Sequence, residues 1–437
     1  MELSHSKFTY EYVSNSIEQG VIEDINAVFP VLGDSTLIHI ATFNNDQKLV
    51  DYLLRKGADI NSKSQCWGTV VNIAVILNKL TIVQTLISFG ADFSNINHQI
   101  DFSAFKRFLN AVCNYFKEIP EVLHLNDMYK DLEFVFTYYE VAAQPLNIAI
   151  HGGYVKMVEL LLENNADPNP DPDRYGSPLI FASSATNRNL QIIKLLLAYG
   201  SDVNYCYKNR RETPLHIVVQ EQNSEGVKLF LNHDMIDINK VTKYKESALH
   251  YGIEHMANDD IIRQLFNAGI DINLKNSGGE TAFNIKSRNN SKKVDDAITE
   301  HIAKCSAANF YVSEENLAVA NSGKFGELRD QCLIEIEKMK ITFVGTSYVT
   351  YHCVLYNKCV HKLALRLKYV SDSTISNLDI ESIFPLYGGM MTYRLKKALR
   401  RKKFLFNAIE LTNDIFQELQ LPSTDDPDDG DGRRPIP

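Results

Sequence analysis

The chain has 437 residues, of which 45% are hydrophobic and 23% are charged. This composition excludes a largely disordered or fibrous chain, and the length favours two or three domains or one elongated repeat array. The net charge of −9 argues against bulk binding to nucleic acid or to an anionic membrane. Seven cysteines without a C-x-x-C pair favour a reducing compartment, so we expect a cytoplasmic protein without a disulfide framework. We find no signal-peptide pattern and no apolar run long enough to span a membrane.

The first 310 residues repeat themselves with a period of 33 or 34 residues. Each copy combines a short apolar segment, a leucine-rich segment with helical spacing and a turn. Residues 15–29 look like a partial copy that caps the first interface of a stack. Equivalent positions lie one period apart, as in Gly57 and Gly90, Pro145 and Pro178, Pro214 and Ala248, or Ala248 and Ala282.

Each part of the repeat has a physical role. Proline at the first helical turn has its φ angle preset and lacks only an N–H that would have no helical partner. The leucines of the second segment supply one stripe to bury against neighbouring copies. Glycine after that segment allows the left-handed conformation that ends many helices, at Gly57, Gly90, Gly200 and Gly269.

The best-preserved segment, Glu212-Thr213-Pro214-Leu215-His216, resembles the T-P-L-H-x-A signature of the ankyrin repeat. The resemblance implies an all-α ankyrin-repeat solenoid of helix-turn-helix repeats with short β-turn hairpins, followed by a small helical C-terminal domain. We count about eight repeats and an N-terminal cap over residues 1–310.

One repeat near residues 95–140 is diverged or enlarged. Its aromatic residues have helical spacing on both sides of Pro120, which predicts two helices around a turn. This segment is interpreted either as a docking surface or as a wider core filled by larger side chains, and buried aromatics favour the second interpretation.

Residues 311–421 keep helical patterns without the period. The segments 332–340, 383–387 and 393–405 resemble the PRANC domain, which follows ankyrin arrays in poxvirus and parasitoid-wasp proteins. In that family the domain ends in a truncated F-box that begins with Leu-Pro and recruits the Skp subunit of cullin ubiquitin ligases. Here Leu421-Pro422 is followed by the acidic stretch 423–437, which contains Pro and Gly, so we expect residues 422–437 to form a disordered tail and not the docking helix.

Three groups of residues have side chains capable of metal binding, phosphate binding or catalysis, and a structural role is favoured for each. His352, Cys353, Cys359 and His361 fit no ordinary zinc spacing, so we expect neither a metal nor a cofactor. The basic run Tyr393–Lys403 fits a nuclear-localisation or phosphate-binding patch, but it also fits a solvated helix face whose buried side is formed by Leu395, Ala398, Leu399, Leu405 and Phe406. The equivalent residues His39, His216 and His250 are expected to bridge backbone groups of the neighbouring turn.

No nucleophile, paired-carboxylate or phosphate-binding motif has a convincing context, so we predict that the chain is not an enzyme. Four asparagines resemble the site that asparaginyl hydroxylases modify in ankyrin repeats. A side-chain hydrogen bond that stabilises the hairpin explains them equally well. They are Asn61, Asn204, Asn239 and Asn273.

The sequence therefore predicts a scaffold that binds target proteins through its repeats. The resemblance to the PRANC family implies a substrate adaptor for a cullin-type ubiquitin ligase, with Skp and cullin subunits as partners. The alternative is an occupancy inhibitor that masks a signalling protein or a Rel-type transcription factor, in the cytoplasm or the nucleus. Target contacts are expected at large or charged residues of the hairpin tips: Trp67, Arg174, Tyr175, Tyr207, Lys208, Arg210, Arg211, Tyr244 and Lys245.

Overall fold

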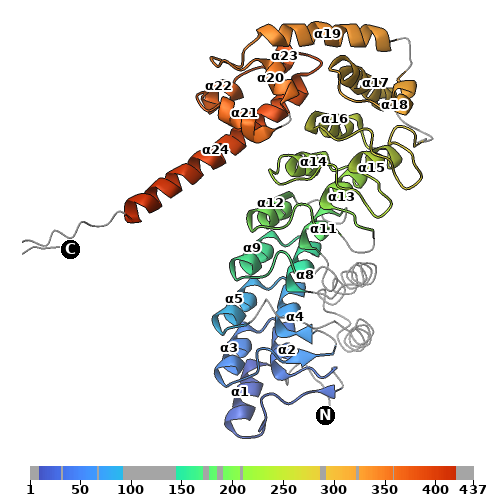
Figure 1. The fold of residues 1–437 in the computed structure, drawn as a ribbon. Coiled ribbons are helices and arrows are strands. Elements are labelled where there is room, and N and C mark those ends of the chain that lie inside the picture. Colours follow the sequence, from blue (N-terminus) through green and yellow to red (C-terminus); the bar gives the residue numbers. More distant parts are fainter. Residues whose placement is uncertain are drawn as a thin grey trace, which may run out of the picture. The chain divides into compact units, whose positions relative to one another are not determined.

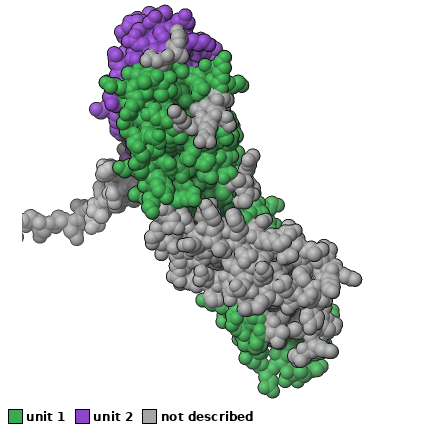
Figure 2. All heavy atoms as spheres, turned by 90° about the vertical axis from the view of Figure 1, so that its right-hand side faces the viewer, with its two compact units in different colours: residues 1–299, 312–322 green, residues 300–311, 323–437 purple. Residues whose placement is uncertain are grey.

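The computed structural model describes residues 9–30, 33–65, 68–91, 144–170, 177–184, 190–206, 210–285, 292–320, 324–357 and 359–419. The chain divides into two compact units, which Figure 2 colours separately. Unit 1 comprises Met1–Thr299 and Val312–Ser322, and unit 2 comprises Glu300–Tyr311 and Gly323–Pro437. The units interleave close to the boundary that the sequence predicts near residue 310. The diverged repeat expected near 95–140 and the tail at 422–437 lie outside the described residues.

Unit 1 is a stack of short helix pairs in two layers, which confirms the predicted ankyrin-repeat solenoid (Figure 1). The first helices are α2 (Leu37–Phe43), α4 (Val70–Ile76), α8 (Pro145–His151), α11 (Pro178–Ser183), α13 (Pro214–Gln220) and α15 (Ala248–Glu254). The second helices are α3 (Gln47–Arg55), α5 (Leu80–Ser88), α9 (Val155–Glu163), α12 (Leu190–Ala198), α14 (Ser224–Leu231) and α16 (Asp259–Ala268).

Consecutive first helices pack on one another along the whole stack, from α2 through α4, α8, α11 and α13 to α15. The contact between α4 and α8 makes these two helices direct neighbours although a long segment of chain separates them. At the N-terminal end, α1 (Tyr10–Glu18) packs against α3, as expected of a cap. The strands β1 (Lys63–Ser64) and β2 (Gly68–Thr69) form an antiparallel hairpin before α4.

The predicted leucine stripe forms the core of the second layer. Its members occupy the same place in five of the six second helices and are fully buried, so each contributes about 2 to 3 kcal/mol of hydrophobic free energy. They are Leu53, Leu86, Leu161, Leu196 and Leu265. The four glycines expected in the left-handed region all have φ between +83° and +92°.

A buried histidine joins each of three hairpins to the next. In α13, Nδ1 of His216 accepts the backbone N–H of Thr213 at 3.2 Å and lies 2.7 Å from its hydroxyl. Because Nδ1 accepts, the neutral ring carries its proton on Nε2, which donates to the carbonyl of Glu246 at 3.1 Å. His250 repeats this geometry with Ser247 and the carbonyl of Glu280, and His39 repeats it with Thr36 and Gly68. The predicted bridging role is confirmed.

A row of asparagines forms a second set of bonds between repeats. The Oδ1 atom of Asn204 accepts the backbone N–H of Asp237 at 2.7 Å, and Oδ1 of Asn239 accepts that of Asp271 at 2.8 Å. Two further bonds of this kind join Asn26 to Asp59 and Asn169 to Asp202. The side-chain-to-backbone bonds proposed for Asn204 and Asn239 are therefore present, and hydroxylation stays a prediction.

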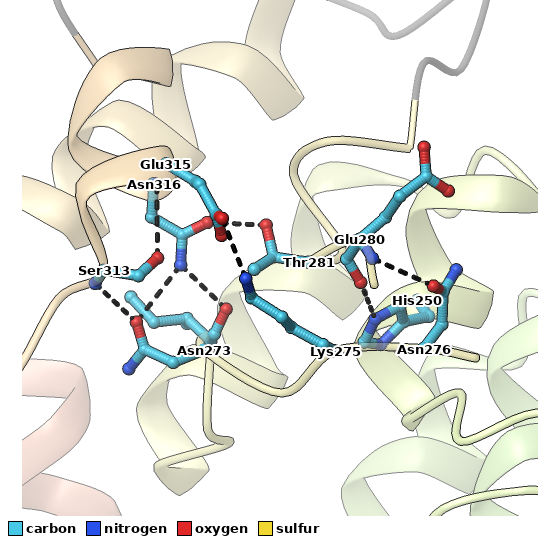
Figure 3. A network of polar contacts seen from close by, with 10 residues as sticks. His250, Asn273, Lys275, Asn276, Glu280, Thr281, Ser313, Glu315 and Asn316 are labelled. Carbon is cyan, nitrogen blue, oxygen red and sulfur yellow. Dashed lines mark hydrogen bonds and ion pairs between the residues drawn. The ribbon is translucent and has the colours of Figure 1, made fainter. Parts of the chain in front are cut away.

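The last asparagine of this row anchors a polar cap (Figure 3). Oδ1 of Asn273 accepts the backbone N–H of Ser313, just before α18 (Glu314–Val319). From α18, the fully buried Asn316 donates to the carbonyl of Ile272 at 2.9 Å and accepts the hydroxyl of Thr281 at 2.7 Å. At the surface, Lys275 and Glu315 form an ion pair at 2.8 Å. Residues 313–316 thus supply hydrogen-bond and ion-pair partners to the polar groups of the preceding hairpin.

Unit 2 is built around α24 (Gly388–Leu419). This helix packs against α20 (Tyr351–Tyr356), α21 (Val360–Arg366) and α23 (Ile380–Ile383), and α19 (Phe325–Ile341) packs on α20. The short α22 (Asp372–Ser376) lies between α21 and α23 in sequence, and α17 (Lys292–Ala307) precedes α18. The carboxylate of Glu335 accepts the backbone N–H groups of Leu386 and Tyr387. The core contains Tyr351, Phe384, Tyr387, Met391 and Leu395.

The buried histidines predict a loss of stability in mild acid. Burial lowers the pKa of His39 and of His216 to about 4, whereas an unfolded histidine titrates near 6.5. Below pH 6.5 the histidines of the unfolded chain become protonated, whereas the buried rings of the folded chain stay neutral. Each of the two histidines should therefore lower the free energy of unfolding by about 2 kcal/mol between pH 7 and pH 5. Urea unfolding across this pH range should show a shallower pH dependence for His216→Asn than for the parent chain. The exposed His361 gives the control substitution His361→Asn, and equal slopes for both variants would contradict the assignment.

The buried amide of Asn316 in the polar cap predicts that one substitution lowers the free energy of unfolding substantially. Replacing Asn316 by Ala leaves the hydroxyl of Thr281 and the carbonyl of Ile272 without their buried partner, so we expect about 2 to 4 kcal/mol of destabilisation. Glu315→Ala removes only a half-exposed ion pair of the same helix and should cost less than about 1 kcal/mol. Chemical unfolding of both variants measures the difference, and similar losses would show that the buried amide has no special role.

Candidate protein-binding surface

The hairpins before α13, α15 and α17 form a hydrogen-bonded row. The backbone N–H of Lys243 donates to the carbonyl of Arg210 at 2.8 Å, and the N–H of Ser277 donates to the carbonyl of Tyr244 at 2.7 Å. The same hairpins are also held by the buried histidines, since His216 and His250 donate hydrogen bonds to the carbonyls of Glu246 and Glu280. Side chains at these tips are therefore held on a fixed backbone.

Four of the nine predicted contact residues lie on this row. The side chain of Arg210 is 58% exposed and that of Tyr244 is largely exposed, and Arg211 and Lys245 are exposed as well. The structure brings these four residues together on adjacent hairpins. The other five lie outside the described residues: Trp67, Arg174, Tyr175, Tyr207 and Lys208.

Two further lysines of the row were missed by sequence reasoning. Lys243 is exposed beside Tyr244, and Lys275 occupies the next hairpin, where it pairs with Glu315. Their signal was present, since each stands within a few residues of the Ser or Thr that ends its hairpin, Ser247 or Thr281. A selection weighted towards aromatic residues and arginine overlooked it.

Two acidic groups of the row, Glu212 and Glu246, face inward. Glu212 is only 8% exposed, accepts the hydroxyl of Tyr251 at 2.6 Å and lies 3.7 Å from Arg210. Burial, with the nearby Glu254, raises the pKa of Glu246 above its ordinary value. The tips thus present cations outward and keep two of the carboxylates at their base.

A second exposed surface lies on the later part of α24. Met391, Leu395 and Ala398 are buried against unit 2, whereas Phe406 is 43% exposed and Ile409 is 53% exposed. Phe404 and Leu411 are exposed to a similar degree. Within unit 2, this end of α24 runs beyond the helices that cover its beginning (Figure 1).

The basic run on α24 is only partly the solvated face that we expected. Arg394 donates to the carbonyls of Val354 and Leu355, and Lys402 donates to the carbonyl of Val370 at 2.6 Å. The buried side that was expected to include Phe406 is interrupted before this residue, because the neighbouring helices do not extend that far. Part of the run therefore holds unit 2 together.

The His and Cys residues considered for metal binding form no metal site in the part of the chain that the structure describes. There, no group of three or more His, Cys, Asp or Glu residues is arranged to hold a metal ion. The ring of His352 packs on Tyr356, with centroids 4.4 Å apart. None of the described helices is both long and apolar enough to cross a membrane.

Comparison with known proteins adds two kinds of finding. A family model of three ankyrin repeats matches residues 109–207 and 179–276, and a single-repeat model matches residues 34–65. An ankyrin repeat protein of fowlpox virus is 22% identical over 283 residues, which cover 62% of this chain and 81% of the viral protein. Alpha-latroinsectotoxin-Lt1a of Latrodectus tredecimguttatus is 28% identical over 55% of this chain, but this match spans only 19% of the toxin.

Among solved structures, the chain is similar to the ankyrin repeat domain of Bcl-3, a member of the IkappaB family. The identity is 19% and the TM-score is 0.44, over 60% of this chain and 98% of that domain. It is also similar to the human ASB11 ankyrin repeat domain, with 17% identity and a TM-score of 0.43, over 60% of this chain and 96% of that domain. The family models and the helix pairs together show that unit 1 is an ankyrin-repeat solenoid.

Proposed function

We propose that the chain is a non-enzymatic scaffold that holds a target protein on its repeats and links that target to a cullin-type ubiquitin ligase through unit 2. The ankyrin fold is typically an interaction module, and its contacts with partners concentrate on hairpin tips and first helices. The hairpin row supports the first half of the proposal, because it presents exposed arginine, lysine and tyrosine side chains on a braced backbone. We place this activity in the cytoplasm or the nucleus.

The link to a ubiquitin ligase is supported by one observation, the exposed apolar end of α24. Residues 391, 395, 398, 402, 405 and 409 recur at alternating steps of four and three, which places them on one face of the helix. The first three members pack in the core of unit 2, whereas Ile409 is largely exposed. A helix that continues its buried stripe into solvent is typical of a surface that another protein covers. In the resembled PRANC family, the Skp subunit docks near this end of the domain.

The alternative is an occupancy inhibitor that masks a signalling protein or a Rel-type transcription factor. The sequence after Leu421 favours it, since the acidic stretch that contains Pro427 and Gly430 supplies no apolar stripe for a further docking helix. In that case the repeats alone would account for the activity, and unit 2 would recruit nothing.

Point substitutions in the full chain distinguish the two functions better than truncation, because the units interleave near residue 310. The double variant Phe406→Ser/Ile409→Ser removes two half-exposed apolar side chains, each worth about 1.4 kcal/mol or more when buried in an interface. We expect at least about tenfold less Skp and cullin in pull-downs from cell lysate, with the bound targets unchanged, as read by mass spectrometry.

The matched control is Asn407→Ser/Glu410→Ser, which changes exposed polar positions of the same turns. It should retain the ligase subunits. If the parent chain recovers targets but neither Skp nor cullin, the adaptor function is wrong and the occupancy function remains.

A further inference from the structure

Two hairpin tips carry a large cation in a backbone conformation that suits glycine. Arg211 has φ of +57° and Lys245 has φ of +59°, in the left-handed region that side chains with a Cβ adopt at a cost. Both stand two residues before the Thr or Ser that begins the following helix. The next hairpin has Gly279 at this position, with φ of +79°. The fold therefore accepts glycine here, and two successive hairpins have a strained cation instead.

These cationic side chains are exposed and form no ion pair with the described residues. Arg211, Lys243 and Lys245 form no ion pair with any described residue, and Tyr244 stands between the two lysines with 54% of its surface exposed. We call these four residues the cationic strip. Two carboxylates of these hairpins are turned inward, since Glu212 is buried against Tyr251 and Arg210 and Glu246 is half-buried. Strain that stability does not require is typical of residues retained for binding.

The strip has a regular spacing. Its hairpins are joined by the main-chain bond from Lys243 to Arg210, so their tips are one repeat apart, which is about 10 Å for packed helices. An extended peptide in the polyproline II conformation has three residues per turn and advances about 3.1 Å per residue. Acidic side chains three residues apart would therefore lie on one face, about 9 Å apart, and meet the cations of successive hairpins.

We propose that the cationic strip binds an extended acidic segment of a target protein, with carboxylates three residues apart and an apolar group over Tyr244. This inference rests on the proposed function and names the chemistry of its partner. A peptide is favoured over nucleic acid, because the chain carries a net charge of −9 and Glu254 and Glu280 are exposed near the same hairpins.

The test is fluorescence anisotropy with the full chain and a labelled twelve-residue peptide that has Asp at every third position. We expect saturable binding that weakens as salt rises from 50 to 200 mM, and no binding of the peptide with Asn in place of Asp. The variant Arg211→Gly/Lys245→Gly should bind at least tenfold more weakly. It should also unfold at the same temperature as the parent or above it, because glycine relieves the left-handed strain.

The control Lys48→Gln/Lys194→Gln removes two exposed cations from second helices and should leave binding within twofold of the parent. If both double variants weaken peptide binding equally, the peptide is attracted to positive charge anywhere on the surface, and the proposal is overturned. Unchanged binding by Arg211→Gly/Lys245→Gly, or equally tight binding of a single-stranded oligonucleotide of the same charge, would also overturn it.

The same variant separates this inference from the proposed function. If lysate targets remain bound to Arg211→Gly/Lys245→Gly as they are to the parent, the strip is not their docking site and only the inference fails. If the parent captures no target at all, the scaffold function fails, and the peptide titration still decides whether the strip recognises acidic segments.

Discussion

The structure of unit 1 depends on the bonds that join each hairpin to the next. A single helix pair cannot bury its apolar face, and a stack of such pairs would slide unless something fixed the register. The buried imidazole of His216 fixes it by accepting from its own repeat and donating to the carbonyl of Glu246 in the next one. The bond from the backbone N–H of Asp237 to Asn204 adds a second fixed point between the same two repeats. Leucine burial supplies most of the free energy, and these polar bonds select one register.

The same device explains how much of the fold could be predicted from the sequence. Some residues meet a requirement of their own local structure. Pro214 suits the first turn of a helix, Gly200 adopts the left-handed conformation, and His216 bridges two hairpins. Local requirements of this kind are visible wherever they recur at a fixed period. Asn316 has the same position relative to its cap as the histidines, but it follows Ser313-Glu314-Glu315 and so carries no recognisable signature. Its role in closing the array depends on bonds to Ile272 and Thr281 that only the folded chain brings together.

The candidate surfaces were predictable to a different degree. Exposure at a hairpin tip follows from the repeat register, so Arg210, Arg211, Tyr244 and Lys245 could be named in advance. The inward turn of Glu212 and Glu246 could not, because it depends on the positions of Tyr251 and Glu254. Phe406 of α24 was expected to be buried, and its exposure was missed for a related reason. Helical periodicity shows that a face is apolar, but the length of the neighbouring helices decides where burial stops.

A repeat array separates stability from recognition because the two use different atoms. The main-chain bonds between hairpins accept any side chain that the backbone geometry permits, so tip residues can change without loss of register. The left-handed tip position is the exception, since there a side chain with a Cβ costs free energy that glycine avoids. Arg211 and Lys245 therefore differ in kind from other exposed cations such as Lys48, whose helical conformation carries no such cost. Where a stable scaffold retains strain at its surface, the strained side chain is the first place to look for a partner.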